Sequence, residues 1–144
     1  MREILFRGKR KDNGEWVCGD LLQDKDLEKC YIEYFEYYSS ENGPQRDYCQ
    51  CEVIPETVGQ YTGLTDKNGK KIFEGDIVKI KDYSKGCALN YEQPTSNWVV
   101  KWNDKYAQFT IDYMSLLPYK HFDESEVIGN IHDNPELLKG GVKE

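Results

Sequence analysis

The sequence predicts a mainly β protein, built as a small bent sheet or a partly closed SH3-like barrel. It also predicts an N-terminal β-hairpin lobe and a short C-terminal helix. Three observations support this fold class. Short apolar runs are separated by glycine-containing turns, 13% of the 144 residues are aromatic and so suit strands, and a helix-start sequence occurs near the end of the chain. We expect two lobes, residues 1–58 and residues 59–144.

The N-terminal lobe is expected to begin with a hairpin. Ile4–Phe6 and Glu15–Cys18 are the predicted strands, and Asp12-Asn13-Gly14 is the turn, because Asn-Gly readily adopts the positive φ angles of a tight hairpin. Residues 39–47 are predicted to form a loop, since they contain Asn-Gly-Pro. A partner strand then follows at Cys49–Ile54 and ends at a proline.

Residues 31–38 form an aromatic segment whose pattern allows two interpretations. The apolar positions fit a helical spacing, whereas the density of aromatic residues favours a strand. We predict a strand here. The helical spacing includes Leu27, Tyr31, Tyr34, Phe35 and Tyr38.

The C-terminal lobe is expected to consist of short strands joined by tight turns. Glycine allows the turns at 66–69 and 74–76, and the aspartate of Glu74-Gly75-Asp76 is expected to bond the reversing backbone. A loop is predicted at 82–97. Asn134 and Pro135 suit the N-cap and first position of a closing helix. The predicted strands are 60–64, 70–73, 77–80, 98–102, 109–111 and 126–131.

The charge of the chain limits its partners. The chain has 26 acidic and 19 basic residues, a net charge of −7, and residues 20–42 contain seven of the acidic residues against two lysines. This balance argues against bulk electrostatic binding to nucleic acid or to an anionic membrane. No stretch has the apolar length of a signal peptide or a membrane span, and five cysteines make an odd number. We therefore expect a cytoplasmic protein.

Several motifs, spread in order over nearly the whole chain, resemble the YopX family of bacteriophage and prophage proteins. The resemblance implies a β-rich fold, an origin in a phage or an integrated prophage, a bacterial host cell and self-association. It implies no biochemical activity and transfers no catalytic residue. The motifs are Phe6-Arg7-Gly8-Lys9 with Trp16, residues 54–64, Asp66-Lys67-Asn68-Gly69-Lys70, Glu74-Gly75-Asp76-Ile77-Val78 and residues 126–138.

The sequence contains no pattern that identifies a catalytic or metal site. Cys49-Gln50-Cys51 lacks the spacing of a structural zinc site, and its two thiols are expected to lie on one face of a strand. His132 and Asp133 are adjacent, so on a strand they would point to opposite faces. We therefore expect no enzyme activity, no metal ion and no cofactor.

The aromatic segment is the candidate protein interface, because aromatic side chains contribute much of the binding energy of interfaces. The expected partners are a second copy of the chain and another protein of the host or phage. The alternative is that the segment is an ordinary core strand with an acidic, solvated rim. The candidate interface residues are Tyr31, Tyr34, Phe35, Tyr37 and Tyr38.

A second hypothesis is a small barrel that binds nucleic acid. Basic side chains at two hairpins would follow a phosphate backbone, and tryptophans would stack on bases. The alternative is that the lysines keep strand edges soluble and that the tryptophans fill the core. The candidate basic residues are Arg7, Lys9, Arg10, Lys11, Lys70 and Lys71.

Overall fold

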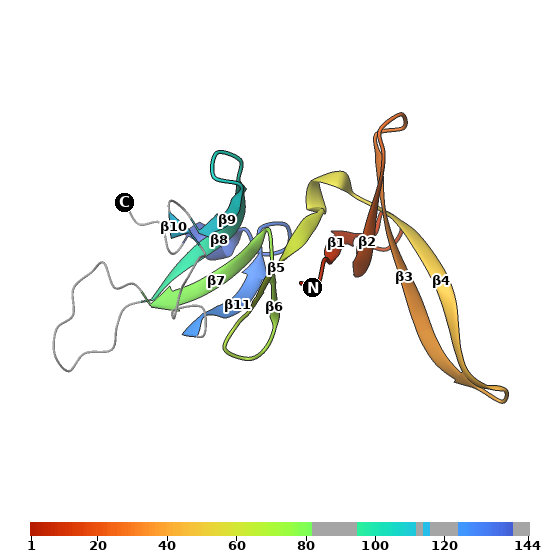
Figure 1. The fold of residues 1–144 in the computed structure, drawn as a ribbon. Helices are drawn as coiled ribbons and strands as arrows, with labels where there is room; N and C mark the ends of the chain where they lie inside the picture. The colour runs from red at the N-terminus through yellow and green to blue at the C-terminus, as the bar shows by residue number, and fades with distance from the viewer. Residues whose placement is uncertain (82–94, 112–113, 116–123, 140–144) are drawn as a thin grey trace. The chain divides into compact units, whose positions relative to one another are not determined.

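The computed structural model describes residues 1–81, 95–111, 114–115 and 124–139 (Figure 1). The predicted mainly β fold is confirmed, with a 3-10 turn η1 (Pro55–Thr57) and a short helix α1 (Glu136–Lys139). The strands are β1 (Phe6–Lys9), β2 (Trp16–Asp24), β3 (Lys29–Ser40), β4 (Gly43–Val53), β5 (Gly59–Thr65), β6 (Lys71–Phe73), β7 (Asp76–Lys81), β8 (Thr95–Asn103), β9 (Gln108–Ile111), β10 (Met114–Ser115) and β11 (Glu126–Asn130).

The strands form two antiparallel sheets, and neither closes into a barrel over the described residues. One sheet has the order β4-β3-β2-β1-β5-β6 and the other β10-β9-β8-β7-β11. The chain divides into two compact units, residues 1–61 and residues 62–144. The domain boundary expected at 58/59 stays a prediction, because a compact unit is not by itself an independently folding domain.

The first unit contains the N-terminal hairpin. β1 pairs with β2 from Phe6↔Gly19 to Lys9↔Trp16, and Gly14 in the predicted turn has φ +72°. The first strand begins at Phe6, two residues later than the sequence pattern predicts. Gly8 lies against Val53, and a Cβ at this glycine would come within 2.9 Å of the valine side chain. This close approach lets the hairpin pack on the buried face of β4.

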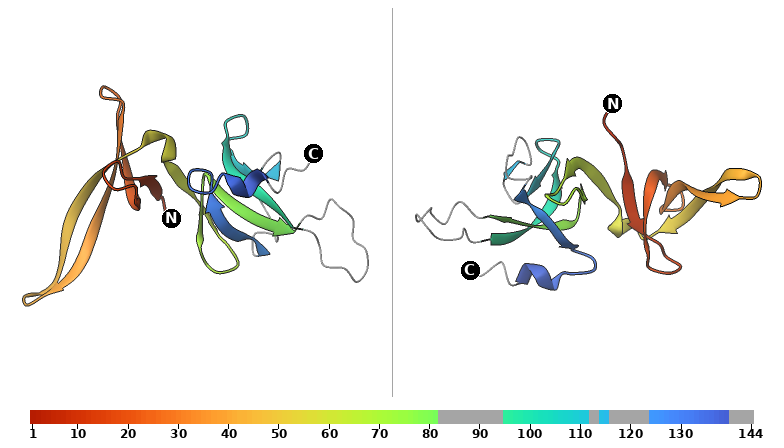
Figure 2. Two further views of the ribbon diagram at one scale, coloured as in Figure 1. Left: turned by 180° about the vertical axis from the view of Figure 1, so that it is seen from behind. Right: turned by 90° about the horizontal axis from the view of Figure 1, so that it is seen from below.

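The aromatic segment is a strand, as predicted, and it pairs with β4 from Cys30↔Val53 to Ser40↔Gly43 (Figure 2). The loop predicted at 39–47 is wrong, because only Glu41 and Asn42 form the turn and β4 already begins at Gly43. Pro44 fits inside this strand because β4 lies at the end of the sheet, where a missing N–H breaks no ladder bond.

The last residues of β4 are held by the segment that follows β1. Arg10 forms an antiparallel bridge with Val53, the Lys11 N–H donates to the Glu52 carbonyl at 3.1 Å, and the Ile54 N–H donates to the Lys9 carbonyl at 2.8 Å. Residues 9–11 therefore cover the outer edge of β4 at its C-terminal end. The buried side chains of Ile32 and Val53 lie on the inner face of this part of the sheet.

The second unit has its own apolar core. Val78 and Ile80 share one face of β7, as predicted, and both belong to this core. The predicted loop at 82–97 lies outside the described residues up to 94, and its last three residues belong instead to β8, where they pair with Lys79–Lys81. The buried core residues are Ile72, Val78, Ile80, Val100 and Ile111.

Two buried aspartates organise the turns of this unit. Asp76 accepts a hydrogen bond from the Phe73 N–H at 2.8 Å, and Gly75 has φ +88°, so the predicted Glu74-Gly75-Asp76 turn is confirmed. Asp66 accepts from the N–H groups of Asn68 and Lys70 at 2.9 Å each and from that of Val127 at 3.0 Å. Asp66 therefore connects the β5–β6 turn to the start of β11.

The short C-terminal helix is also confirmed. The Leu137 N–H donates to the Asn134 carbonyl at 3.1 Å, which begins the first helical turn. The Asn97 side-chain amide donates to the Leu137 carbonyl at 2.9 Å and so attaches this turn to β8. Neither of the helical segments in the described residues has the length and apolar character needed to cross a membrane.

Candidate functional site

The hairpin formed by β3 and β4 extends past the end of β2. β2 pairs with β3 only between Lys29 and Glu33, whereas the pairing of β3 with β4 continues to Ser40↔Gly43. In Figures 1 and 2 the two strands run on together beyond β2 as a two-stranded ribbon. We call residues 34–49 the projecting hairpin. A hairpin of two strands alone is only marginally stable in water, so this part of the chain is expected to be stabilised by its side chains or by a partner.

The predicted interface residues do not form one surface. Because side chains alternate along a strand, Tyr31, Phe35 and Tyr37 lie on one face of β3 and the other two tyrosines lie on the opposite face. Tyr31 is half-buried next to β2, whereas Phe35 and Tyr37 are exposed on the projecting hairpin. The five residues therefore divide between the two faces of β3, and Tyr38, on the second face, is also exposed.

Two residues of β4 lie on the same face as the exposed rings of Phe35 and Tyr37. Phe35 faces Tyr48 across the ladder, with ring centres 5.9 Å apart in an edge-to-face arrangement, and Tyr37 faces Arg46. The Arg46 guanidinium lies 4.4 Å from the centre of the Phe35 ring. Phe35, Tyr37 and Tyr48 are 45%, 75% and 56% exposed. We call Phe35, Tyr37, Arg46 and Tyr48 the aromatic face.

Polar contacts at the base of the hairpin hold one end of the aromatic face in place. The Gln50 side-chain amide donates to the Glu33 carboxylate at 3.1 Å. The pKa of Tyr48 is raised, first by its hydrogen bond with Glu33, then by burial and by the charge of that carboxylate. Glu33 thus interacts with two residues of β4, Gln50 and Tyr48.

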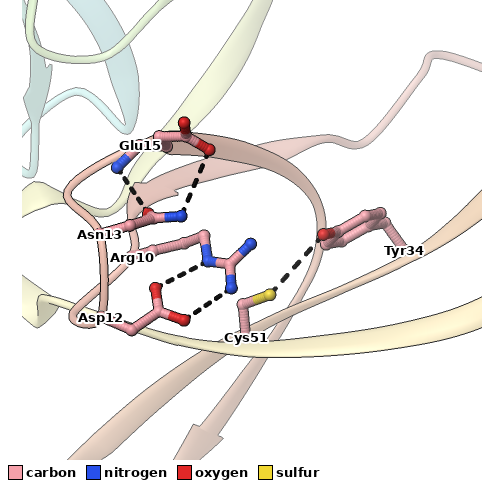
Figure 3. Close-up of polar contacts among 6 residues, drawn as sticks. All are labelled: Arg10, Asp12, Asn13, Glu15, Tyr34 and Cys51. Atoms are coloured by element: carbon pink, nitrogen blue, oxygen red, sulfur yellow. Dashed lines mark hydrogen bonds and ion pairs between the residues drawn. The ribbon is translucent and has the colours of Figure 1, made fainter.

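The opposite face of the hairpin contains the remaining two tyrosines. The Tyr34 hydroxyl lies 3.7 Å from the Cys51 sulfur (Figure 3), and this hydrogen bond, with burial and nearby thiols and Glu36, raises the pKa of Tyr34 to about 12. The Tyr38 hydroxyl donates to Asp47 at 3.3 Å, and the charge of Asp47 is the main cause that raises the pKa of Tyr38. Both hydroxyls therefore bond to residues of β4.

The candidate basic residues fall in both units, and those of the first unit have partners within it. The Arg10 guanidinium binds both carboxylate oxygens of Asp12 at 2.9 and 2.6 Å (Figure 3), which raises the pKa of Arg10 and lowers that of Asp12. Lys11 forms a 2.9 Å ion pair with Glu52.

The other candidate cations of the first unit lie over an aromatic ring. The charged groups of Arg7 and Lys9 lie 4.8 and 5.9 Å from the centre of the Trp16 ring. Lys70 and Lys71 belong to the second unit, at the β5–β6 turn and the start of β6. Nucleic-acid binding by these residues stays a prediction.

The sequence matches the family model described as YopX protein over residues 5–139. The chain belongs to the YopX family. The solved structure of protein EF1440 from Enterococcus faecalis is similar to this YopX-family chain, with a TM-score of 0.58 and 26% sequence identity. The similarity covers 96% of this chain and 99% of the other. No curated protein matches the chain.

In this YopX-family chain, the sequence pattern did not identify Arg46 and Tyr48 as interface candidates, because Arg46 falls in the predicted loop 39–47 and Tyr48 between that loop and the strand predicted at 49–54. A turn of two residues at Glu41-Asn42 would have set the register and paired Phe35 with Tyr48. Alternation of exposed and half-buried positions is weak in this part of β4, since both faces of the hairpin are open to solvent. The signal that identifies these residues is therefore the pairing itself.

The cysteines provide no metal site in the part of the chain that the structure describes. Among the described cysteines, Cys18, Cys30, Cys49 and Cys51, no disulfide is formed. No three His, Cys, Asp or Glu side chains among the described residues are grouped closely enough to hold a metal ion. Cys87 and His121 lie outside the described residues.

Proposed function

We propose that this YopX-family chain is a non-enzymatic protein that self-associates and acts by binding another protein through the aromatic face of its projecting hairpin. The observation that carries this proposal is the exposure of Phe35, Tyr37 and Tyr48 on one face of a ribbon that extends past the rest of its sheet. Aromatic residues and arginine are the residue types most enriched among the residues that dominate interface energies.

The chemistry of the hairpin indicates what kind of surface it would bind. Arg46 is the one cation among residues 34–49 and lies on the aromatic face, whereas the carboxylates of Glu36 and Asp47 lie on the opposite face of the hairpin. A complementary partner would present an apolar groove for the rings and an acidic group for Arg46. Tyrosine and phenylalanine lose little rotamer freedom on binding, which makes a preformed strand of such residues an efficient contact.

A matched pair of variants tests this function. Tyr37→Ser removes the most exposed ring of the aromatic face, whereas Tyr106→Ser removes an exposed ring from the β8–β9 turn of the other unit. We expect a binding protein captured from a cell lysate by the wild type to be retained by Tyr106→Ser and lost by Tyr37→Ser. Equal capture by both variants would contradict the assignment of the aromatic face.

The family membership also supports a proposal about the origin of the protein. We infer that the gene belongs to a phage or an integrated prophage and that the protein acts in the cytoplasm of the bacterial host. A similar protein from Enterococcus faecalis is consistent with a bacterial setting. Fractionation of host cells, with the protein detected in the cytosolic or in the membrane and secreted fractions, tests the location.

A further inference from the structure

The projecting hairpin has an open strand edge along Tyr34–Ser40. β2 is the neighbour of β3 on that side, and its pairing ends at Glu33. Over the next seven residues no described strand pairs with β3 on the β2 side. Unpaired backbone N–H and C=O groups along such an edge are a template for another strand.

Glu36 is the one charged residue of this edge, which has few of the features that usually prevent strand pairing. Proteins protect open edges with lysine, proline or bulges. The segment Tyr34-Phe35-Glu36-Tyr37-Tyr38-Ser39-Ser40 contains no lysine, proline or glycine, and its register with β4 is unbroken. A run of six or seven residues with high β-propensity, low charge and no proline is the kind of sequence that pairs edge to edge.

The other edge of the hairpin is less suited to pairing. β4 begins with Gly43 and Pro44, and proline cannot donate to a ladder. At its other end, residues 9–11 already cover the outer side of Glu52 and Val53. The open edge of β3 is therefore uninterrupted over seven residues, whereas that of β4 is limited at both ends.

We propose that β3 pairs antiparallel with β3 of a second copy of this chain over Tyr34–Ser40, with Tyr37 opposite Tyr37. The inference rests on the proposed function for self-association and names the strand that performs it. In a dimer with a two-fold axis normal to the sheet, the numbers of the two residues that face each other add up to the same even number for every pair. With a sum of 74, all seven open residues pair, from Tyr34 opposite Ser40 to Ser40 opposite Tyr34.

Charge selects this register from its neighbours. A sum of 74 places Glu36 opposite Tyr38 of the partner, so no like charges meet. A sum of 72 places Glu36 opposite itself, and like charges directly opposite are destabilising. A sum of 76 pairs only residues 36–40 and leaves Tyr34 and Phe35 outside the ladder.

The paired hairpins make a four-stranded sheet of order β4-β3-β3-β4. Three or more strands with an apolar face are far more stable than an isolated hairpin, which accounts for a long ribbon with exposed rings. On one face, Arg46 and Tyr37 of each copy form a row across the four strands, because opposite residues share a face. The aromatic face stays open, so edge pairing is compatible with binding of another protein.

Cysteine cross-linking tests the register directly. Residues opposite each other in antiparallel strands have Cα atoms about 4.5–5.5 Å apart, and a disulfide needs about 4.4–6.8 Å. We expect Tyr37→Cys to form a reducible dimer of the 16.9 kDa chain under mild oxidation. Phe35→Cys is the matched control on the same face, since its position would be displaced from that of the second copy by about 13 Å, four residues along the strand. Both variants keep the native thiols.

A pair of arginine variants tests the charge argument. Tyr37→Arg places a guanidinium opposite its own copy, whereas Tyr38→Arg places one opposite Glu36 of the partner. We expect Tyr37→Arg to weaken dimerisation by roughly tenfold and Tyr38→Arg to maintain or tighten it, as measured by light scattering over a dilution series. A shared loss of folding does not produce this opposite pair of effects.

The possible outcomes separate this inference from the proposed function. An oligomeric wild type whose Tyr37→Cys and Phe35→Cys variants cross-link equally, or not at all, overturns the β3 pairing but leaves self-association. A wild type that stays monomeric at every concentration overturns the pairing and self-association, while capture of a partner by the aromatic face is still decided by Tyr37→Ser. Selective cross-linking through Tyr37→Cys supports the pairing.

Discussion

Replacing Asp66 with asparagine tests how the second unit is held together. Asp66 is only 5% exposed, and its two carboxylate oxygens accept three backbone hydrogen bonds. Two of these come from its own turn and one from Val127, which lies 61 positions further along the chain. Asp66→Asn preserves the shape of the side chain but turns one oxygen into an N–H donor. In either amide orientation, a buried donor then faces a backbone N–H.

The expected cost follows from these contacts. A hydrogen bond to a charged group contributes about 1.5–3 kcal/mol, and a buried donor left without an acceptor costs about 1–3 kcal/mol. Asn retains an oxygen for part of the set, so we expect a loss of about 2–4 kcal/mol in the free energy of unfolding. For a chain of this size that corresponds to a melting temperature lowered by roughly 10 °C.

The effect is expected to depend on pH. Burial raises the pKa of Asp66, but the N–H groups of Val127, Lys70 and Asn68 outweigh burial, and the pKa lies below its usual value of 3.8. A carboxyl group with a lowered pKa in the folded state contributes stability that is present above the unfolded pKa and is lost as pH falls through the folded pKa. The difference in the free energy of unfolding between wild type and Asp66→Asn should therefore have its full value at pH 6 and shrink below about pH 4.

Urea unfolding at pH 6 and at pH 3 measures both quantities. Asp104→Asn is the matched control, because Asp104 is an exposed aspartate in a turn of the same unit. We expect Asp104→Asn to change the free energy of unfolding by less than about 0.5 kcal/mol. A loss below 1 kcal/mol for Asp66→Asn at pH 6, or a difference that grows toward pH 3, would refute the role assigned to this carboxylate.

Three further predictions concern the first unit. Gly19→Ala should destabilise the chain by about 2 kcal/mol or more in urea unfolding, because the added Cβ would clash with the backbone carbonyl of Glu33. A variant as stable as the wild type would contradict this packing. Ile32→Ala should cost about 2–5 kcal/mol, since Ile32 is fully buried, and a loss under 1 kcal/mol would place it outside the core. Tyr34→Phe should remove a phenol that ionises near pH 12 in an ultraviolet titration. If the difference between the wild-type and variant titrations has its midpoint at the ordinary tyrosine value of about pH 10, the bond to Cys51 is not formed.

Local patterns predicted much of the fold because they describe interactions over a few residues. Asn13-Gly14 and Glu74-Gly75-Asp76 predicted their turns, since positive φ angles and short aspartate–backbone bonds are local. Alternation along β7 placed Val78 and Ile80 on the core face because the side-chain period of a strand is two. The family could also be named from motifs that occur in order along the chain.

Contacts between distant residues were decided only by the tertiary structure. The Asn-Gly-Pro sequence at 42–44 predicts a loop over residues 39–47. In the structure, the pairing of β3 with β4 makes all of these residues strand except 41 and 42, since the edge position of β4 tolerates proline. That register brings Tyr48 to Phe35 and divides the five predicted aromatic residues between two faces. The bond from Asp66 to Val127 likewise joins segments that no local pattern relates. Sequence determined the turns and the faces of strands because these depend on neighbouring residues, whereas register and edges depend on which strands meet.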